Sequence, residues 1–302
     1  MSLTAILLVS ISAVAHATWN LLGKRSNPST GFFALANLVG IVLLLPFPII
    51  FRGLLPEIPT LVWIYLVITG VFQVVYFVGL SGAYRNGDMS LVYPLARSLP
   101  VILIALVTVL LGIGKPITWL GAAGILLVSA GCFILPQPSF RQIRWRSYLT
   151  PYVLWSLLAA VGTCGYTLID SEALRTMRTQ PSLGGNNFAI TGVFIFFETV
   201  STALTLLIYT ALVSQERQRL VDVSRTGKIQ VCITAALITG AYGLVLLAMA
   251  YASNVSYVAA FRQLSIPLGA LFGIAVQKEA STTTKLVGIG SVLTGLVLVS
   301  LV

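Results

Sequence analysis

The sequence predicts an all-α integral membrane protein in which ten transmembrane helices form two inverted five-helix repeats around a central cavity. The first observation is composition: hydrophobic residues make up 57% of the 302 residues and charged residues only 9%, and the mean hydropathy is +0.97. Such a chain cannot give a water-facing globule an ordinary polar surface, so its outer surface must meet lipid. The second observation is that apolar stretches recur almost from end to end, and the third is that the two halves resemble each other.

The apolar stretches are separated by short polar breaks. A hydrocarbon core of about 30 Å is crossed by roughly 20 apolar helical residues, and an α-helix satisfies its backbone polar groups internally. The stretches of this length occupy residues 3–23, 31–51, 60–84, 89–112, 116–136, 148–170, 187–213, 229–252, 255–276 and 283–302. The first stretch is expected to stay in the mature protein, because it lacks a basic n-region, exceeds a signal-peptide core in length and is followed by Lys24 and Arg25.

The two halves of the chain share features at a constant offset. A shift of 167 positions aligns Ala83-Tyr84 with Ala250-Tyr251, Pro100 with Pro267, Gly121 with Gly288 and Leu126 with Leu293. With two residues of slippage, Arg97 also aligns with Arg262. A five-helix unit crosses the membrane an odd number of times, so its second copy lies upside down relative to the first. We therefore expect a first repeat at 1–136, a basic linker at 137–147 and an inverted second repeat at 148–302.

Two equivalent stretches carry residues that do not suit a membrane helix. The fourth holds Pro94, Arg97 and Pro100, and the ninth holds Arg262 and Pro267. Proline removes a helical hydrogen bond and frees a carbonyl group, which is tolerated at this depth only beside protein or a wet cavity. Corresponding irregular helices in both halves predict a binding site near the bilayer midplane, of the kind typical of alternating-access transporters.

Several motifs give the chain a family resemblance. They are the turn Tyr84-Arg85-Asn86-Gly87-Asp88 leading into Ser90 to Pro100, the segments Gly114-Lys115-Pro116 to Gly131 and Gln277-Lys278-Glu279 to Gly295, and the opening His16-Ala17-Thr18-Trp19-Asn20 with Lys24. With the five-plus-five layout, these motifs make the chain resemble the drug/metabolite transporter superfamily, in particular its EamA-like ten-helix permeases, over essentially its whole length. The resemblance implies a secondary transporter of a small organic metabolite. One departure is that Gly114-Lys115-Pro116 lacks the acidic residue often found at that turn.

Basic residues indicate the orientation of the chain. The net charge of +10 is spread over many short loops, which fits membrane topology and argues against a nucleic-acid partner. Of the 18 basic residues, twelve fall on one face: Lys24, Arg25, Arg85, Arg141, Arg144, Arg146, Arg217, Arg219, Arg225, Lys228, Lys278 and Lys285. Four fall on the other face: Arg52, Lys115, Arg175 and Arg178. Because cytoplasmic loops carry an excess of Lys and Arg, we expect the first face to be cytoplasmic, both termini to be outside, and the protein to lie in a bacterial cytoplasmic membrane.

Arg97 and Arg262 are the leading candidates for contact with a solute. At 1.5 Å per residue, each lies roughly 10–14 Å from an end of its stretch. A charge at that depth in lipid costs at least about 2.5–3.5 kcal/mol, so both are expected to face the interior. A guanidinium fork matches a carboxylate, and the pair therefore favours a solute with an anionic group. The alternatives are that either arginine snorkels to the surface or locks helices through carbonyl groups and Glu198.

Glu198 is the one acid that the predicted spans place well inside the membrane. A carboxyl group there can exchange a proton as the cavity opens to either side, which makes Glu198 the candidate for proton coupling. An ion pair with an arginine is the alternative and would keep the carboxylate charged. Thr191, Thr202 and Thr205 lie one or two turns away and are expected to give this helix a partly wet face.

Polar residues of other helices complete the predicted site. His16, the only histidine, shares one face of the first helix with Ser12, Asn20 and Gly23. A lone histidine is more often a hydrogen-bonded interior residue than a ligand, and without partners it gives no metal site. Further candidates for the cavity lining are Asn37, Gln73, Tyr76, Tyr93, Tyr166 and Tyr242.

Other residues are assigned structural roles. Asp88 and Asp170 are placed at helix ends, where solvated caps account for them. Cysteines without pairing or metal-ligand spacing are expected to be packing residues, namely Cys132, Cys164 and Cys232. Small residues predict close helix packing either within the chain or in a dimer, so a monomer and a homodimer both stay open; they are Gly121, Gly124, Gly288, Gly290 and Gly295.

A secondary transporter is the interpretation that these features favour. A passive channel and a membrane-embedded lipid-modifying enzyme are the alternatives. The sequence has no Gly-rich phosphate loop, paired carboxylates, His-Cys cluster or nucleophile with a base at recognisable spacing, so neither an enzyme nor a cofactor is expected. Amino acids and their analogues, nucleotide metabolites and cationic drugs stay open as solutes, and two inward arginines favour an anionic group.

Overall fold

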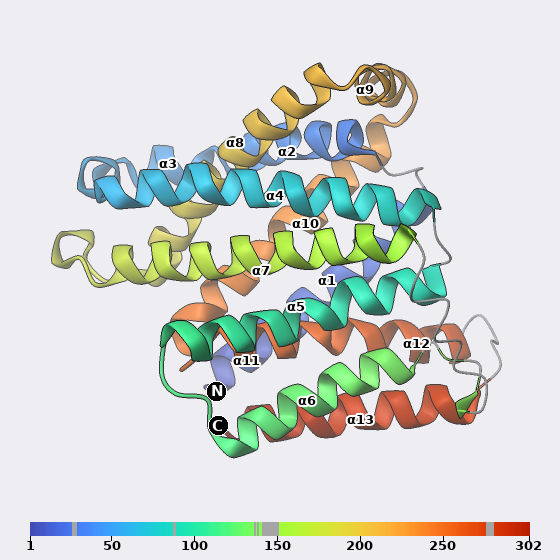
Figure 1. Cartoon of the computed structure of the whole chain (residues 1–302). Helices are drawn as coiled ribbons and strands as arrows, with labels where there is room; N and C mark the ends of the chain where they lie inside the picture. Colours follow the sequence, from blue (N-terminus) through green and yellow to red (C-terminus); the bar gives the residue numbers. More distant parts are fainter. Residues whose placement is uncertain (26–28, 87–88, 136, 138, 141–150, 276–280) are drawn as a thin grey trace.

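Helices form every regular element in the part of the chain that the computed structural model describes, which is residues 1–302 without 26–28, 87–88, 136, 138, 141–150 and 276–280. Side chains at 20–25, 84, 86, 89–97, 151–152, 226, 272–273 and 275 are likewise outside the description. The long helices lie side by side in one bundle (Figure 1). They are α1 (Leu3–Arg25), α2 (Thr30–Leu44), α4 (Thr60–Asn86), α5 (Met89–Leu111), α6 (Trp119–Ile134), α7 (Pro151–Arg178), α8 (Asn187–Leu212), α10 (Lys228–Ala248), α12 (Ser265–Ala275) and α13 (Thr283–Ser300).

Shorter elements join or extend these helices. They are α3 (Pro46–Ile50), η1 (Arg52–Glu57), η4 (Pro181–Leu183), α9 (Ser214–Thr226), η5 (Met249–Tyr251), α11 (Val255–Phe261) and η6 (Arg262–Leu264). Where they are described, all the predicted apolar stretches fold as helices, and three of them consist of more than one element. The second stretch divides at Leu45, where Pro46 starts α3, the eighth ends in η5, and the ninth divides into α11, η6 and α12.

The two stretches that were predicted to be irregular behave differently. The ninth changes to a 3-10 turn at Arg262–Leu264, as the sequence indicates. The fourth is a continuous α-helix across Pro94 and Pro100, so its predicted irregularity is wrong for the backbone. A proline can stay inside a membrane helix where neighbouring helices and local adjustments satisfy the freed backbone groups.

Close helix pairs build the core of the bundle. α4 packs along α7, α1 along α10, α2 along α8 and α6 along α13. In the last pair, a Cβ atom on Gly124 would lie 2.8 Å from the Gly295 carbonyl oxygen, and one on Gly295 would lie 2.7 Å from the Gly124 carbonyl oxygen. Small residues let helix backbones approach this closely. The predicted glycine seam therefore includes a contact within one chain.

Helix α9 is an amphipathic segment that the apolar pattern does not predict. Its Glu216 is buried and accepts hydrogen bonds from the Thr30 backbone N–H at 2.9 Å and the Thr30 hydroxyl at 2.5 Å. Arg85 Nη1 donates to the same carboxylate at 2.7 Å, and Arg219 Nη1 donates at 2.5 Å. Glu216 therefore fastens α9 to the start of α2 and the end of α4.

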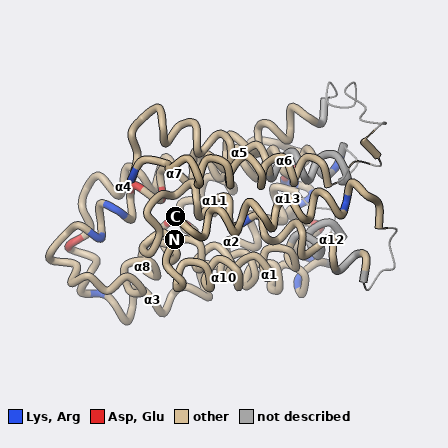
Figure 2. The backbone as a smooth tube through the Cα atoms, turned by 90° about the horizontal axis from the view of Figure 1, so that it is seen from below, with Lys and Arg blue, Asp and Glu red and all other residues tan. Residues whose placement is uncertain are grey.

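The outside of the bundle is apolar. Large hydrophobic side chains are exposed along it, up to 93% for Trp119 and 80% for Leu212. Lys, Arg, Asp and Glu lie mainly toward the two ends (Figure 2), and the chain termini lie close together in both views, toward the end opposite α9. Six helices of the described chain are long and apolar enough to cross a membrane, at Thr30–Ile50, Thr60–Ala83, Val153–Arg178, Asn187–Leu212, Lys228–Tyr251 and Thr283–Ser300, and shorter apolar helices lie at Leu3–Trp19, Ser98–Leu111 and Trp119–Ile134. The chain is a multi-pass membrane protein.

Candidate functional site

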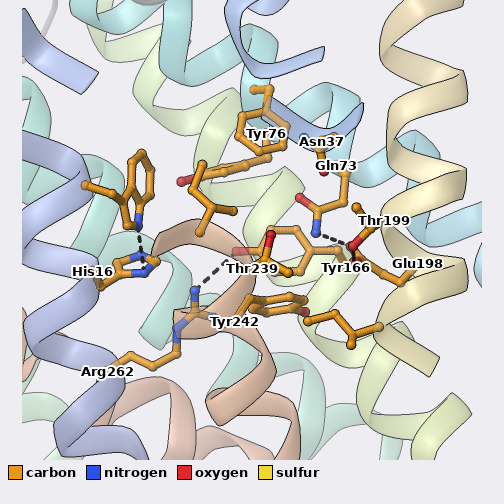
Figure 3. A pocket seen from close by; sticks show the side chains of 14 residues that line it. His16, Asn37, Gln73, Tyr76, Tyr166, Glu198, Thr199, Thr239, Tyr242 and Arg262 are labelled. Atoms are coloured by element: carbon orange, nitrogen blue, oxygen red, sulfur yellow. Dashed lines mark hydrogen bonds between the residues drawn. The ribbon is translucent and has the colours of Figure 1, made fainter. Parts of the chain in front are cut away.

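A cavity lies between helices of both halves of the chain. Its volume of about 40 Å³ accommodates a few water molecules, since one needs roughly 10–15 Å³ by the same measure. Side chains from α1, α2, α4, α7, α8, α10 and η6 line it (Figure 3): His16, Trp19, Asn37, Gln73, Tyr76, Phe77, Tyr166, Ile195, Glu198, Thr199, Ile238, Thr239, Tyr242 and Arg262. The cavity thus joins segments that are far apart in the sequence.

Most of the residues selected from the sequence meet at this cavity. His16, Gln73, Tyr76, Tyr166, Glu198, Tyr242 and Arg262 line it, together with Asn37. The side chains of Asn20, Tyr93 and Arg97 are outside the described part of the chain. The lining residues that the sequence did not select as cavity residues are apolar or small, and only their position beside the polar residues identifies them: Trp19, Phe77, Ile195, Thr199, Ile238 and Thr239.

Arg262 enters the cavity from the 3-10 turn that interrupts the ninth apolar stretch. Arg262 is only 6% exposed, so its side chain does not snorkel to the surface. One guanidinium nitrogen, Nη2, donates to the Tyr166 hydroxyl at 3.4 Å, and Cζ lies 5.7 Å from the ring centroid of Tyr242. Within the described residues, no carboxylate forms an ion pair with Arg262. A guanidinium has five N–H donors, and the hydrogen bond to Tyr166 uses one of them.

Glu198 lies on the opposite side of the cavity from Arg262 (Figure 3). The residue is 4% exposed, and Gln73 Nε2 donates to its Oε1 at 2.7 Å. The Thr202 hydroxyl donates to Oε1 at 3.3 Å, and the Thr199 hydroxyl donates to Oε2 at 3.4 Å. Neutral donors therefore hold this carboxyl group, and the ion pair with an arginine does not form among the described side chains.

Tyrosine rings lie between Arg262 and Glu198. Tyr76 and Tyr166 meet edge to face with ring centroids 5.6 Å apart, and Tyr166 and Tyr242 do so at 5.5 Å. Aromatic rings in such contacts are rigid and offer both an apolar face and a hydroxyl group. The lining can therefore hold an organic body beside a charged group.

His16 is held by its neighbour on α1. Trp19 Nε1 donates to His16 Nδ1 at 3.1 Å, and the two rings meet edge to face with centroids 5.1 Å apart. His16 lies near Arg262 at the cavity wall (Figure 3). Within the described residues, no group of three or more His, Cys, Asp and Glu side chains could hold a metal ion.

Asp170 requires a correction. The sequence places it at a helix end as a solvated cap, but α7 continues to Arg178 and Asp170 is 0% exposed. The Tyr242 hydroxyl donates a hydrogen bond to Asp170 Oδ2. A signal for this position was present, because Thr163, Tyr166 and Asp170 follow each other at three and four residues and therefore share a helix face.

Arg178, counted among the basic residues of one face, is the last residue of α7 and donates to the Thr191 hydroxyl at 3.1 Å and to the Leu246 carbonyl at 2.9 Å. One further expectation about polar residues is wrong. The threonines of α8 do not form a wet face, because Thr202 donates to Glu198 and Thr205 donates to the Gly70 carbonyl at 3.0 Å. These side chains join helices instead of lining water.

Comparisons with known proteins agree with this architecture. Residues 3–136 match the model of the EamA-like transporter family. A solved structure described only as the crystal structure of a protein aligns with a TM-score of 0.68 and 17% sequence identity, over 100% of this chain and 98% of that chain, which shows a shared fold. A comparison with curated protein sequences gives no significant match.

Proposed function

Because the family match over residues 3–136 places this chain in the drug/metabolite transporter superfamily, we propose that it is a secondary transporter that moves a small organic metabolite across the membrane by alternating access. A cavity inside an apolar bundle, lined by residues from both halves, is the kind of site that such carriers use. The solute binds in this cavity, and the helices around it open it to one side at a time.

The proposed scaffold has ten membrane-crossing helices in two inverted repeats, 1–136 and 148–302. The helix contacts support it, because they follow a twofold pattern. If α1 corresponds to α7 and α4 to α10, then the contact of α4 with α7 is the counterpart of the contact of α10 with α1. The pairs α2 with α8 and α6 with α13 then lie across the pseudo-twofold axis. The family match also ends at residue 136, where the first repeat is proposed to end.

The solute carries an anionic group that binds Arg262. The observation that carries this step is that a buried guanidinium faces the cavity with two tyrosines beside it and no carboxylate partner among the described residues. A buried charge in a membrane interior is costly, which marks such groups as functional. A carboxylate or phosphate on the solute would pair directly with the guanidinium in matching geometry.

Proton coupling and orientation complete the proposal. Glu198, across the cavity from Arg262, is the group that takes up and releases a proton as the cavity opens to each side. The end of the bundle that carries α9 and its basic residues faces the cytoplasm, in the inner membrane of a bacterium.

Counterflow in proteoliposomes tests this function. Vesicles loaded with an unlabelled candidate solute should accumulate the labelled one against its gradient and should saturate, which a passive channel does not do. The candidate solutes are anionic metabolites, amino acids and cationic drugs. Those that stabilise the purified protein against thermal unfolding are chosen for the counterflow measurement. Arg262→Ala should abolish counterflow with normal membrane insertion, whereas Arg175→Ala, which removes an exposed guanidinium, should not. Non-saturable flux would indicate a channel, and turnover of a lipid by the purified protein would indicate an enzyme.

A further inference from the structure

We propose that Asp170 is a second proton-binding carboxyl group of this carrier and that Tyr242 links its protonation to the occupancy of the cavity. This inference rests on the proposed transport function and adds to the role of Glu198. It assigns a function to a buried acid that does not itself line the cavity.

Asp170 lies just behind the cavity wall on α7. It is fully buried, the Tyr242 hydroxyl of α10 donates to its Oδ2, and Thr69 of α4, which is also fully buried, lies beside it. No ion pair with Asp170 forms among the described residues. A buried carboxylate that has only neutral donors pays a large desolvation cost, and this cost falls when water reaches it. The charge of Asp170 therefore depends on how tightly the helices close around it.

The neighbouring ionisable groups come from several elements. Glu198 of α8 and Arg262 of η6 both lie close enough to Asp170 for electrostatic interaction, and Tyr166 lies one turn earlier on α7. Arg97 on α5, which packs along α7, has a side chain outside the described part. The described interior thus holds two acids and one guanidinium in a single region. An anionic solute adds another negative charge there, and a proton on one acid offsets it.

Tyr242 connects Asp170 to the solute site. Its hydroxyl binds Asp170, while its ring lines the cavity, lies 5.7 Å from Arg262 Cζ and contacts Tyr166. A solute that binds the Arg262 guanidinium must lie against the Tyr242 ring and can therefore displace it. Because the hydroxyl of the same ring donates to Asp170, a displacement of the ring changes this hydrogen bond. In each cycle, one carboxylate oxygen of Asp170 binds one proton from water on the open side and releases it to water on the other side. No other covalent bond changes.

Infrared spectroscopy tests the proton site without a known solute. Purified protein in lipid nanodiscs is titrated with acid and base while the carbonyl band of protonated carboxyl groups is recorded. Wild-type protein should show two interior carboxyl bands, of which Asp170→Asn removes one and Glu198→Gln removes the other. Glu172→Gln is the matched control, because it lies on the same helix in an exposed pair with Arg175 and should leave both bands. Tyr242→Phe retains the ring and should shift the Asp170 band without removing it.

A transport measurement provides the second arm. With a solute identified by counterflow, the ratio of protons to solute should fall by half in Asp170→Asn, while solute exchange continues. The inference is overturned if the carboxyl bands of Asp170→Asn and Tyr242→Phe are both the same as in wild-type protein. It is also overturned if Asp170→Asn keeps the wild-type ratio of protons to solute. If no solute shows saturable counterflow in wild-type protein, the proposed transport function fails, and the infrared bands still decide whether Asp170 binds a proton.

Discussion

Removal of the Glu216 carboxylate should destabilise the protein far more than removal of a similar acid at an exposed site. The Glu216 side chain is 4% exposed and accepts from Arg85, Arg219 and both the N–H and the hydroxyl of Thr30. Breaking a buried ion pair by deleting one partner costs about 3–5 kcal/mol. The Arg85 side chain is 29% exposed and can regain some hydration, so we expect about 3 kcal/mol for Glu216→Ala.

Glu172 provides the matched control. It also pairs with an arginine three residues away, but its side chain is 28% exposed and that of Arg175 is 65% exposed. Exposed pairs of this kind contribute about 0–1 kcal/mol. The free energy of unfolding is measured for both alanine variants by denaturant titration in the same detergent, followed by tryptophan fluorescence. Equal losses in the two variants would refute the reasoning that burial at the α9 junction sets the cost.

Three further predictions concern the cavity and the helix seam. Arg262→Lys should keep transport but raise the half-saturating solute concentration roughly 10- to 150-fold, because one charged hydrogen bond of about 1.5–3 kcal/mol is lost. An unchanged half-saturating concentration in counterflow would mean that the guanidinium does not bind the solute through two donors. Glu198→Gln should reduce the response of uptake to a pH gradient by about half, because Asp170 still carries a proton, while exchange persists; a wild-type response would reject the coupling role of Glu198. Gly295→Ala should lower the free energy of unfolding by about 1–3 kcal/mol, because the added Cβ meets a backbone carbonyl of α6 that cannot move away. Gly290→Ala is the control and should cost little, because nothing lies within 4 Å of the added Cβ. Similar unfolding free energies for the two variants would contradict the close packing of α6 and α13.

Hydropathy predicts the long helices well because each apolar stretch must satisfy its backbone inside lipid. It does less well at their ends. Helix α7 continues past its apolar stretch through Asp170, Glu172 and Arg175 to Arg178, where the apolar pattern has already ended. Helix α9 was missed because its position depends on the contact of Glu216 with Thr30, which are 186 residues apart in the sequence.

The cavity was predictable where ionisable groups interrupt apolar stretches. Arg262 and Glu198 stand out in this way, and both line the cavity. Asp170 does not stand out, because the predicted stretch ends at its position and a cap explained it there. The wrong expectation for α5 has another cause: the residue pattern shows that a proline removes a hydrogen bond, but the surrounding helices decide whether the backbone breaks.

The backbone contact between α6 and α13 constrains how the bundle can move. Gly124 and Gly295 bring the two helices so close that neither can slide without collision of carbonyl groups and side chains. If the two halves rock against each other, displacement at this edge is small, because the backbones of α6 and α13 are in direct contact. The largest movements are then expected on the far side of the cavity, at helices α2, α8 and α9.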